Sequence, residues 1–494
     1  MQLLNSMSGA SPETRLVLLT WAFCLGTDFQ SMTRGDLAAA LGVSTRHLGV
    51  ALEYLVREGY LWKIKSPFKH SVGEERNVRF DYGLTPAAWL MGRDWVSAEC
   101  MWKDEINYVL CLPQSVDETA SEKFAAITTQ MRLVWIALLL SSNEAGYVVG
   151  LDSLTLSKML GMTNEQFRRA VQALSRKGIV SVAANQLART TLFGPMYPIY
   201  KLHPQSTKSK VIMLGVALGD MQLDPMRFLS DLTNYYRRAA KGYGKRKLPI
   251  HGSYLLDEQY FELAKNFRNP RLQALVYHAC MSIIFSVTPS YTANLKTLDS
   301  PKEVHQDSPE QATQVNQTRG CADTALSELV KSILVHGVFC QDLMSFAKAS
   351  NETGEDKLTN VDEVDILRQF TLSELTREVV NLIQQLSQQW RFFVDCIGGA
   401  VRLLDHQRHY CMRTVLPRHN NLVEEKLETD PRGQEYDRLV YCVFEVLVPN
   451  TKEYGDCMVV GDELFTVNSS VTYSKTRKVD RLICWKKGET PQIS

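Results

Sequence analysis

The alternation of apolar and polar positions predicts helices followed by β-hairpins in the first two hundred residues. Apolar residues recur at helical spacing over residues 12–25 and again over 130–141, which predicts a helix in each place. Alternating apolar and polar side chains, bounded by polar loops, predict strands further along. These hairpin strands are expected at residues 60–65 and 77–82, and again at 179–183 and 198–202.

Each hairpin follows a copy of the same sequence motif. Residues 37–45 (LAAALGVST) align with residues 156–164 (LSKMLGMTN) at a constant offset. A glycine directly after a short helix permits the left-handed conformation that turns the chain sharply. Ser44 and Thr163 stand where the next helix needs an N-cap acceptor. The pairs that match at this offset are Leu37/Leu156, Leu41/Leu160, Gly42/Gly161, Ala51/Ala170, Leu55/Leu174, Arg57/Arg176 and Gly59/Gly178.

The order helix, helix, turn, helix, hairpin resembles the winged helix-turn-helix family, in tandem over residues 10–100 and 125–205. The turn pattern L-x3-LG-[VM]-[ST] and the helix exits REGY (57–60) and RKGI (176–179) carry this resemblance. The resemblance implies that the second helix of each unit lies in the major groove of DNA.

Helical spacing separates a buried face from an exposed face in each of these second helices. Arginine and glutamine form bidentate hydrogen bonds with guanine and adenine, so the second unit is expected to read bases. In the first unit Val50 and Glu53 favour dimerisation as an alternative role, and a solvated polar face is the alternative for both units. The expected inward residues are Leu48, Ala51, Leu52 and Leu55, and Phe167, Ala170, Val171 and Leu174. The expected outward residues are Arg46, Val50, Glu53 and Arg57, and Glu165, Arg169, Gln172 and Arg176, with Arg168 at the flank.

Two clusters of cations are expected to bind phosphates. The first hairpin carries Lys63, Lys65, Lys69, Arg76 and Arg79 against two glutamates. Residues 201–250 carry ten cations against three anions, and aromatic rings interleave with cations in the stretch YYRRAAKGYGKRK. That mixture favours single-stranded DNA as a further partner, with a solvated helix end as the alternative. Its cations are Arg237, Arg238, Lys241, Lys245, Arg246 and Lys247.

Composition divides the rest of the chain. Polar residues rich in Pro, Ser, Thr, Gln and Asn predict a linker over 288–320. Apolar stripes after it predict a helical bundle core, with self-association through residues 370–404 as the alternative. We expect a mainly α (α+β) fold. Its parts are winged helix-turn-helix units at 1–110 and 120–215, a basic helical segment at 216–287, the linker, a helical domain at 321–425 and a β-rich module at 426–494.

Overall composition excludes several classes of protein. The chain has 494 residues and a formal net charge of +1, and no apolar run approaches the ~20 residues of a membrane helix. We expect no signal peptide, and eleven cysteines without a CxxC pair favour a reducing cytoplasm over a disulfide framework. His406, His409 and Cys411 lack a second ligand pair, so no metal site is expected. No nucleotide, hydrolase or metalloprotease motif is present, so neither a cofactor nor an enzyme is predicted.

These patterns together predict a sequence-specific double-stranded DNA-binding protein. The first interpretation is a transcriptional regulator of a bacterium or mobile element. The second is a plasmid-type replication initiator that binds repeated origin sites, although the long linker and helical half depart from that architecture. The third is a scaffold whose winged helices dock proteins. The operator, any effector and the oligomeric state are not fixed by these patterns.

Overall fold

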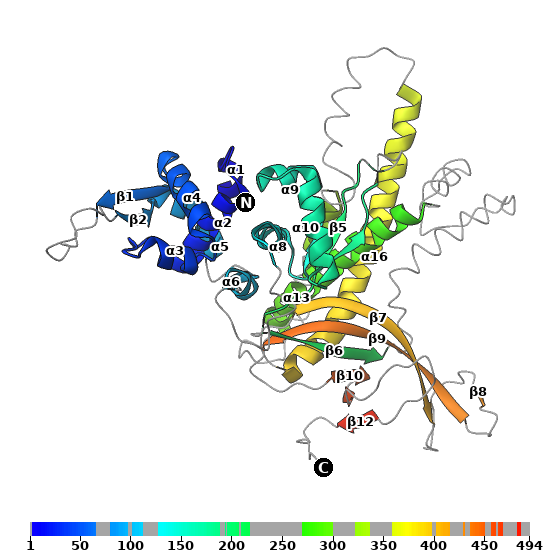
Figure 1. Cartoon of the computed structure of the whole chain (residues 1–494). Helices are drawn as coiled ribbons and strands as arrows, with labels where there is room; N and C mark the ends of the chain where they lie inside the picture. The colour runs from blue at the N-terminus through cyan, green and yellow to red at the C-terminus, as the bar shows by residue number, and fades with distance from the viewer. Residues whose placement is uncertain are drawn as a thin grey trace, which may run out of the picture. The chain divides into compact units, whose positions relative to one another are not determined.

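A computed structural model describes the helices and strands of the chain (Figure 1). The chain divides into two compact units. Unit 1 comprises Met1–Asn185 with Tyr197–Ser206, and unit 2 comprises Gln186–Met196 with Thr207–Ser494. Helices dominate, so the prediction of a mainly α fold is confirmed. The described residues are 2–65, 80–96, 101–111, 127–187, 193, 195–206, 209–217, 269–299, 322–335, 358–397, 402–414, 428–429, 435–449, 456–460, 463–467 and 482–485.

Unit 1 contains two repeats, of which the first spans residues 11–84. Ser11 caps α2 by accepting a hydrogen bond from the Thr14 amide at 3.2 Å, and Pro12 fits the first turn because it has no amide proton. Gln30 forms an isolated antiparallel bridge with Tyr82 of β2, beside the two-stranded hairpin. The elements are α2 (Pro12–Thr20), continued by the π-helix η1 (Trp21–Leu25), then α3 (Arg34–Ala40), α4 (Thr45–Arg57), β1 (Leu61–Lys65) and β2 (Phe80–Leu84). Beside them, α1 (Gln2–Ser6) packs against α5 (Pro86–Val96), which also packs against η1, whereas α6 (Lys103–Cys111) packs against the first helix of the second repeat.

The second repeat spans residues 128–202 and follows the same order. Its sheet has the strand order β3-β5-β4, which matches the Gln30–β2–β1 arrangement of the first repeat. The positive φ angles of Gly42 (62°) and Gly161 (66°) place the predicted left-handed turn in both repeats. The elements are α8 (Thr129–Ser141), β3 (Tyr147–Val148), α9 (Ser153–Met159), α10 (Asn164–Arg176), β4 (Val180–Ala184) and β5 (Ile199–Leu202).

The core of unit 1 lies between the first helices of the two repeats. α2 packs against α8, and each of them also packs against the helix of its own repeat that follows the turn, α4 or α10. Trp21, at the end of α2, and Trp135 in α8 are fully buried. Residues 14–20 of α2 and 131–139 of α8 are buried on every side of the helix, so these two helices hold both repeats in one body.

Unit 2 combines long helices with a seven-stranded sheet. α13 (Pro270–Asp299) packs against α16 (Leu358–Ile397), and residues 322–335 form another helix. Asp323 of that helix accepts hydrogen bonds from Tyr291 Oη at 2.7 Å and Gln384 Nε2 at 2.9 Å, which ties the three helices together. The strands are β6 (Ser209–Ala217), β7 (Arg402–Thr414), β8 (Glu428–Thr429), β9 (Glu435–Pro449), β10 (Asp456–Val460), β11 (Glu463–Val467) and β12 (Leu482–Trp485).

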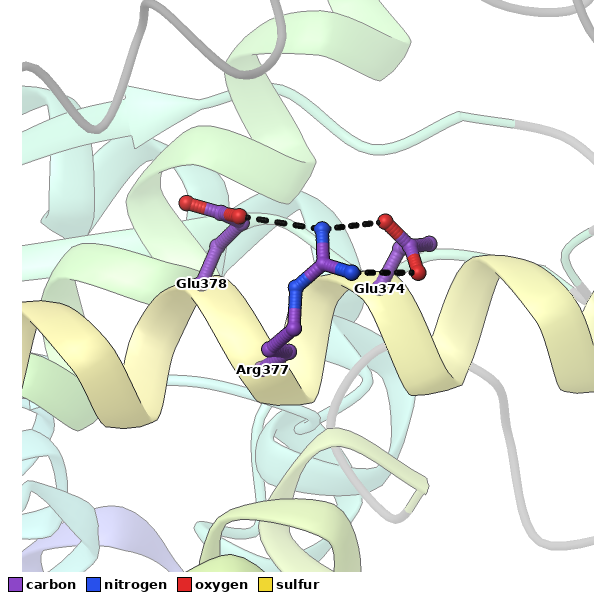
Figure 2. A network of polar contacts seen from close by, with 3 residues as sticks. All are labelled: Glu374, Arg377 and Glu378. Atoms are coloured by element: carbon purple, nitrogen blue, oxygen red, sulfur yellow. Dashed lines mark hydrogen bonds and ion pairs between the residues drawn. The ribbon is translucent and has the colours of Figure 1, made fainter. Parts of the chain in front are cut away.

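The apolar stripe of α16 is core. Leu372, Leu375, Val379, Leu382, Ile383 and Leu386 are all buried within the chain. On the same helix Arg377 makes a bidentate contact with Glu374, at 2.6 and 3.1 Å, and a further contact with Glu378 at 3.2 Å (Figure 2). Self-association through residues 370–404 stays a prediction.

Two predicted boundaries in unit 2 are wrong. Residues 288–299, expected in the linker, continue α13, and within it the hydroxyls of Thr288 and Thr292 donate to backbone carbonyls one turn earlier, each at 2.7 Å. This bonding makes a polar segment compatible with a buried helix. Residues 402–414, expected in a helical domain, form β7 because they pair along β9, which places His406, His409 and Cys411 on a strand.

The sheet also reaches beyond the expected module at 426–494. Its strand order is β12-β11-β10-β6-β9-β7, with β8 paired to β9, so β6 and β7 come from earlier in the chain. β10 pairs with β6 in parallel and the other pairs are antiparallel. Pairing between strands far apart in sequence leaves no local signal, so a pattern confined to residues 426–494 does not predict that β6 and β7 join the sheet.

Within the described ranges, one helix is long and apolar enough to cross a membrane by length and composition. It is Pro270–Leu295 in α13, with 26 residues and a mean hydropathy of 1.3. About two thirds of its apolar window, 67%, is buried inside the structure.

Candidate nucleic-acid interface

α10 presents the strongest candidate surface. Its first turn is fixed by a capping box in which Gln166 N donates to Thr163 Oγ1 at 3.2 Å and Thr163 N donates to Gln166 Oε1 at 2.8 Å. The predicted inward residues Phe167, Ala170, Val171 and Leu174 are buried. The predicted outward residues Glu165, Arg168, Arg169, Gln172 and Arg176 are all exposed, so the prediction of the two faces is confirmed.

Arg169 forms an ion pair with Glu165 one turn earlier on α10. The two side chains are 75% and 72% exposed. An exposed pair at this spacing stabilises a helix by only about 0.3–0.5 kcal/mol, so a stronger partner can displace it. Glu165 thus orients the Arg169 guanidinium along the helix surface and offsets part of its charge.

Arg168 lies at the flank of α10, next to the hairpin strand β5. Burial raises the pKa of Tyr200 on β5 to about 12, and the charge of Arg168 acts in the opposite direction. Tyr200 also packs edge-on against Phe167, with ring centroids 6.4 Å apart. The packed Phe167–Tyr200 pair therefore fixes α10 against the hairpin, with Arg168 on its outer side.

α4 carries a weaker surface of the same kind. Ser44 caps it by accepting from the His47 amide at 3.3 Å, and Arg46, Val50 and Glu53 are exposed as predicted. Val50 is 63% exposed, which is unusual for an apolar side chain. The predicted inward residues Leu48, Ala51, Leu52 and Leu55 are buried.

Arg57 stands at the far end of α4 from Arg46. Its Nε lies 2.9 Å from Glu58 Oε1, and its guanidinium lies over the Tyr54 ring, 5.3 Å from the centroid. The Tyr54 hydroxyl in turn donates to the Ser8 carbonyl at 2.7 Å. Arg57 is exposed, but Glu58 and Tyr54 hold its side chain at the end of the helix. Arg46 is the exposed arginine at the start of α4.

The first hairpin strand has one cationic and one apolar face. Lys63 and Lys65 are exposed, with Lys63 Nζ 4.0 Å from the centroid of Phe80. Trp62, on the opposite face, stacks on Phe29 with centroids 6.1 Å apart, and both rings are partly exposed. The remaining predicted phosphate contacts lie outside the described residues: Lys69, Arg76, Arg79, Arg237, Arg238, Lys241, Lys245, Arg246 and Lys247.

Two buried arginines that the sequence patterns did not single out join the repeats. Arg15 of α2 donates to the Met159 carbonyl oxygen of the second repeat at 2.8 Å. Arg132 of α8 donates to the Gly42 carbonyl oxygen of the first repeat at 3.1 Å. Both lie four residues after the N-cap of their helix, in SPETR and TTQMR, and that shared position is the signal that identifies them.

Both guanidiniums also bond to carbonyls near their own helix. Arg15 binds the Leu4 and Ala10 carbonyls at 2.5 and 3.2 Å, and that of Met7. Arg132 binds the Leu110 carbonyl at 2.8 Å. Burial lowers the pKa of Arg132 to about 10, against the opposing influence of Cys111 and Cys24, so it remains a cation at neutral pH.

A buried carboxylate supports the second hairpin. Glu105 of α6 accepts hydrogen bonds from the Gln205 and Ser206 amides, both at 2.8 Å, just after β5. Burial raises the pKa of Glu105 to about 7, while these two amides act to lower it. Among the described residues, no three His, Cys, Asp or Glu side chains gather as metal ligands would.

Comparison with protein-family models and with curated proteins gives no match to this chain.

Proposed function

We propose that the chain is a sequence-specific double-stranded DNA-binding protein and that its two repeats are winged helices. The observation that carries this proposal is the exposed face of α10, where Arg168, Arg169, Gln172 and Arg176 lie on one side of a helix fixed by its cap. Arginine and glutamine are side chains that form bidentate contacts with guanine and adenine edges. In this proposal α10 enters the major groove, and Lys63 and Lys65 bind phosphate.

The proposed cellular role is that of a cytoplasmic transcriptional regulator of a bacterium or mobile element, without a cofactor and without enzymatic activity. The second candidate is a replication initiator, favoured by two DNA-binding surfaces on one chain. In that role the cations of residues 237–247 would bind single strands.

A third candidate, a protein-docking scaffold, is favoured by the exposed apolar residues of the first repeat. Val50, Trp62 and Phe29 are 63%, 49% and 42% exposed. Salt-independent and weak DNA binding would support docking over DNA recognition, because binding to phosphates releases counterions.

The experiment measures the DNA affinity of Arg169→Ala, Arg176→Ala and wild type. Specific affinity is measured on a selected DNA fragment and non-specific affinity on random DNA. The matched control is Arg271→Ala, which removes an exposed arginine of α13. Each reading variant should lose roughly 10- to 100-fold of specific affinity and little non-specific affinity, since a bidentate base contact contributes ~1–3 kcal/mol. Equal losses on both DNAs would remove the proposed reading role of α10.

A further inference from the structure

The contacts between the two repeats are reciprocal. Arg15, from the first helix of the first repeat, binds the carbonyl of Met159 at the end of α9 in the second repeat. Arg132, from the equivalent position in the second repeat, binds the carbonyl of Gly42 just after α3 in the first repeat. Each arginine therefore reaches from its own first helix to the end of the helix before the turn in the other repeat.

A reciprocal contact of this kind has a defined symmetry. Two like bodies related by a twofold axis contact each other twice, because each body uses the same patch to bind the same second patch on the other. Reciprocal contacts between two similar repeats therefore indicate an approximate twofold axis between them. Such an axis would pass between α2 and α8, which pack directly against each other. The same operation relates α4 to α10, because they occupy equivalent places in the two repeats.

From this symmetry, and resting on the proposed function, we propose that one chain recognises a single inverted repeat with two unlike half-sites. Twofold-related helices read half-sites of opposite orientation, as in dimeric helix-turn-helix proteins. In this protein the two readers belong to one chain, so no second copy is needed for a complete site.

The half-sites must differ because the two helix surfaces differ. α10 presents Arg168, Arg169 and Gln172, which suit guanine and adenine. α4 presents Arg46, Val50 and Glu53, which suit guanine, the thymine methyl group and the cytosine amino group respectively. The palindrome is therefore imperfect, and the half-site read by α10 contributes more of the affinity.

The experiment uses the full chain and its selected DNA site in three synthetic forms. The first keeps the selected inverted arrangement, the second reverses one half-site to give a direct repeat, and the third inserts about five base pairs, half a helical turn, between the halves. We expect the second and third forms to lose roughly 100-fold in affinity, because one half-site's contacts are lost. We also expect one chain per site.

A matched pair of glycine variants tests whether the contact between the two repeats sets the preference for the inverted arrangement. A Cβ added at Gly161 would lie 2.3 Å from the Ala10 carbonyl oxygen and 2.9 Å from Arg15 Nε, across the contact between the repeats. Gly178 has nearly the same backbone angle, φ +68° against +66°, and nothing within 4 Å of an added Cβ. Gly161→Ala should therefore weaken the preference for the inverted arrangement, while Gly178→Ala should keep it.

The outcomes separate this inference from the proposed function. Sequence-specific binding that is indifferent to the orientation of the half-sites, or that needs two chains per inverted repeat, would overturn the inference and leave DNA recognition standing. The absence of any sequence-specific binding would overturn both. If Gly161→Ala does not fold, the three DNA forms with the wild-type chain still decide between these results.

Discussion

Arg132 donates a hydrogen bond from Nη1 to the carbonyl oxygen of Gly42, 3.1 Å away, and so joins the first helix of one repeat to the turn of the other. Its Nη2 donates to the Leu110 carbonyl at 2.8 Å, so one side chain satisfies acceptors from two segments. A buried carbonyl without a donor is costly, and hydrogen bonds to a charged group contribute more than neutral ones. Arg132 is therefore a structural link within unit 1, not a DNA contact.

Replacing Arg132 should destabilise the protein. Arg132→Met keeps much of the apolar stem but leaves the Gly42 and Leu110 carbonyls without this donor, which should cost about 2–4 kcal/mol of unfolding free energy. Urea denaturation measures the change. The control is Arg168→Met on the exposed flank of α10, which should stay within about 0.5 kcal/mol of wild type. Similar losses in both variants would contradict the proposed link.

The buried carboxylate of Glu105 should make stability depend on pH. Its folded-state pKa of about 7 exceeds the ordinary value of 4.5, so the folded state binds more protons between these two pH values. The free energy of unfolding should therefore fall as pH rises from about 4.5 through 7, by up to the order of 3 kcal/mol from this group.

Glu105→Gln should remove this dependence, because an amide does not titrate in that range. The unfolding free energies of wild type and variant are measured at pH 5 and again at pH 8, and the difference between the two proteins is compared at the two pH values. We expect the wild type to lose stability relative to the variant at the higher pH. A constant difference across this range would show that Glu105 titrates normally in the folded protein.

The Glu165–Arg169 pair should moderate DNA affinity. Glu165→Gln removes a negative charge from the proposed DNA surface and frees the Arg169 guanidinium for phosphate or base contacts. Non-specific affinity at low salt should rise about twofold, in line with the ~0.3–0.5 kcal/mol of an exposed pair. Glu328→Gln, which neutralises an exposed glutamate of unit 2, should leave the affinity unchanged. A decrease on random DNA would mean that Glu165 itself supports binding.

The Arg377 cluster of α16 should contribute to the stability of unit 2. The side chain of Glu374 is only 6% exposed and receives two hydrogen bonds from Arg377. Arg377→Lys replaces the two-pronged contact with a single point charge, and a loss of about 1–2 kcal/mol is expected. Thermal unfolding of the full chain measures it, with Arg271→Lys as the exposed control. An unchanged midpoint would mean that solvent screens the pair completely.

Local sequence signals located the elements of unit 1 well. Ser44 and Thr163 cap the helices that follow the turns, and Gly42 and Gly161 adopt the left-handed conformation that the repeated motif predicted. These features depend on a few neighbouring residues, so a short pattern is enough to reveal them. The outward positions on α4 and α10 follow from the same helical periodicity.

Features that depend on distant partners were missed. Arg15 and Arg132 share a position in their helices, but it is their buried contacts across the repeats that show what they do. Residues 288–299 have the composition of a linker, yet they are helical, and the buried hydroxyls of Thr288 and Thr292 are satisfied by carbonyls of the same helix. The helical spacing of apolar residues predicts a helical domain that includes residues 402–414, whereas their pairing with β9 makes them the strand β7.

The central claim is tested most directly by selecting bound fragments from random DNA and from host DNA with the full chain, followed by titration at two salt concentrations. The account predicts one enriched motif whose affinity falls steeply with salt, by roughly 0.9 log unit per log unit of salt for each phosphate neutralised. No enriched motif, together with weak affinity that salt does not change, would contradict it and point to protein docking.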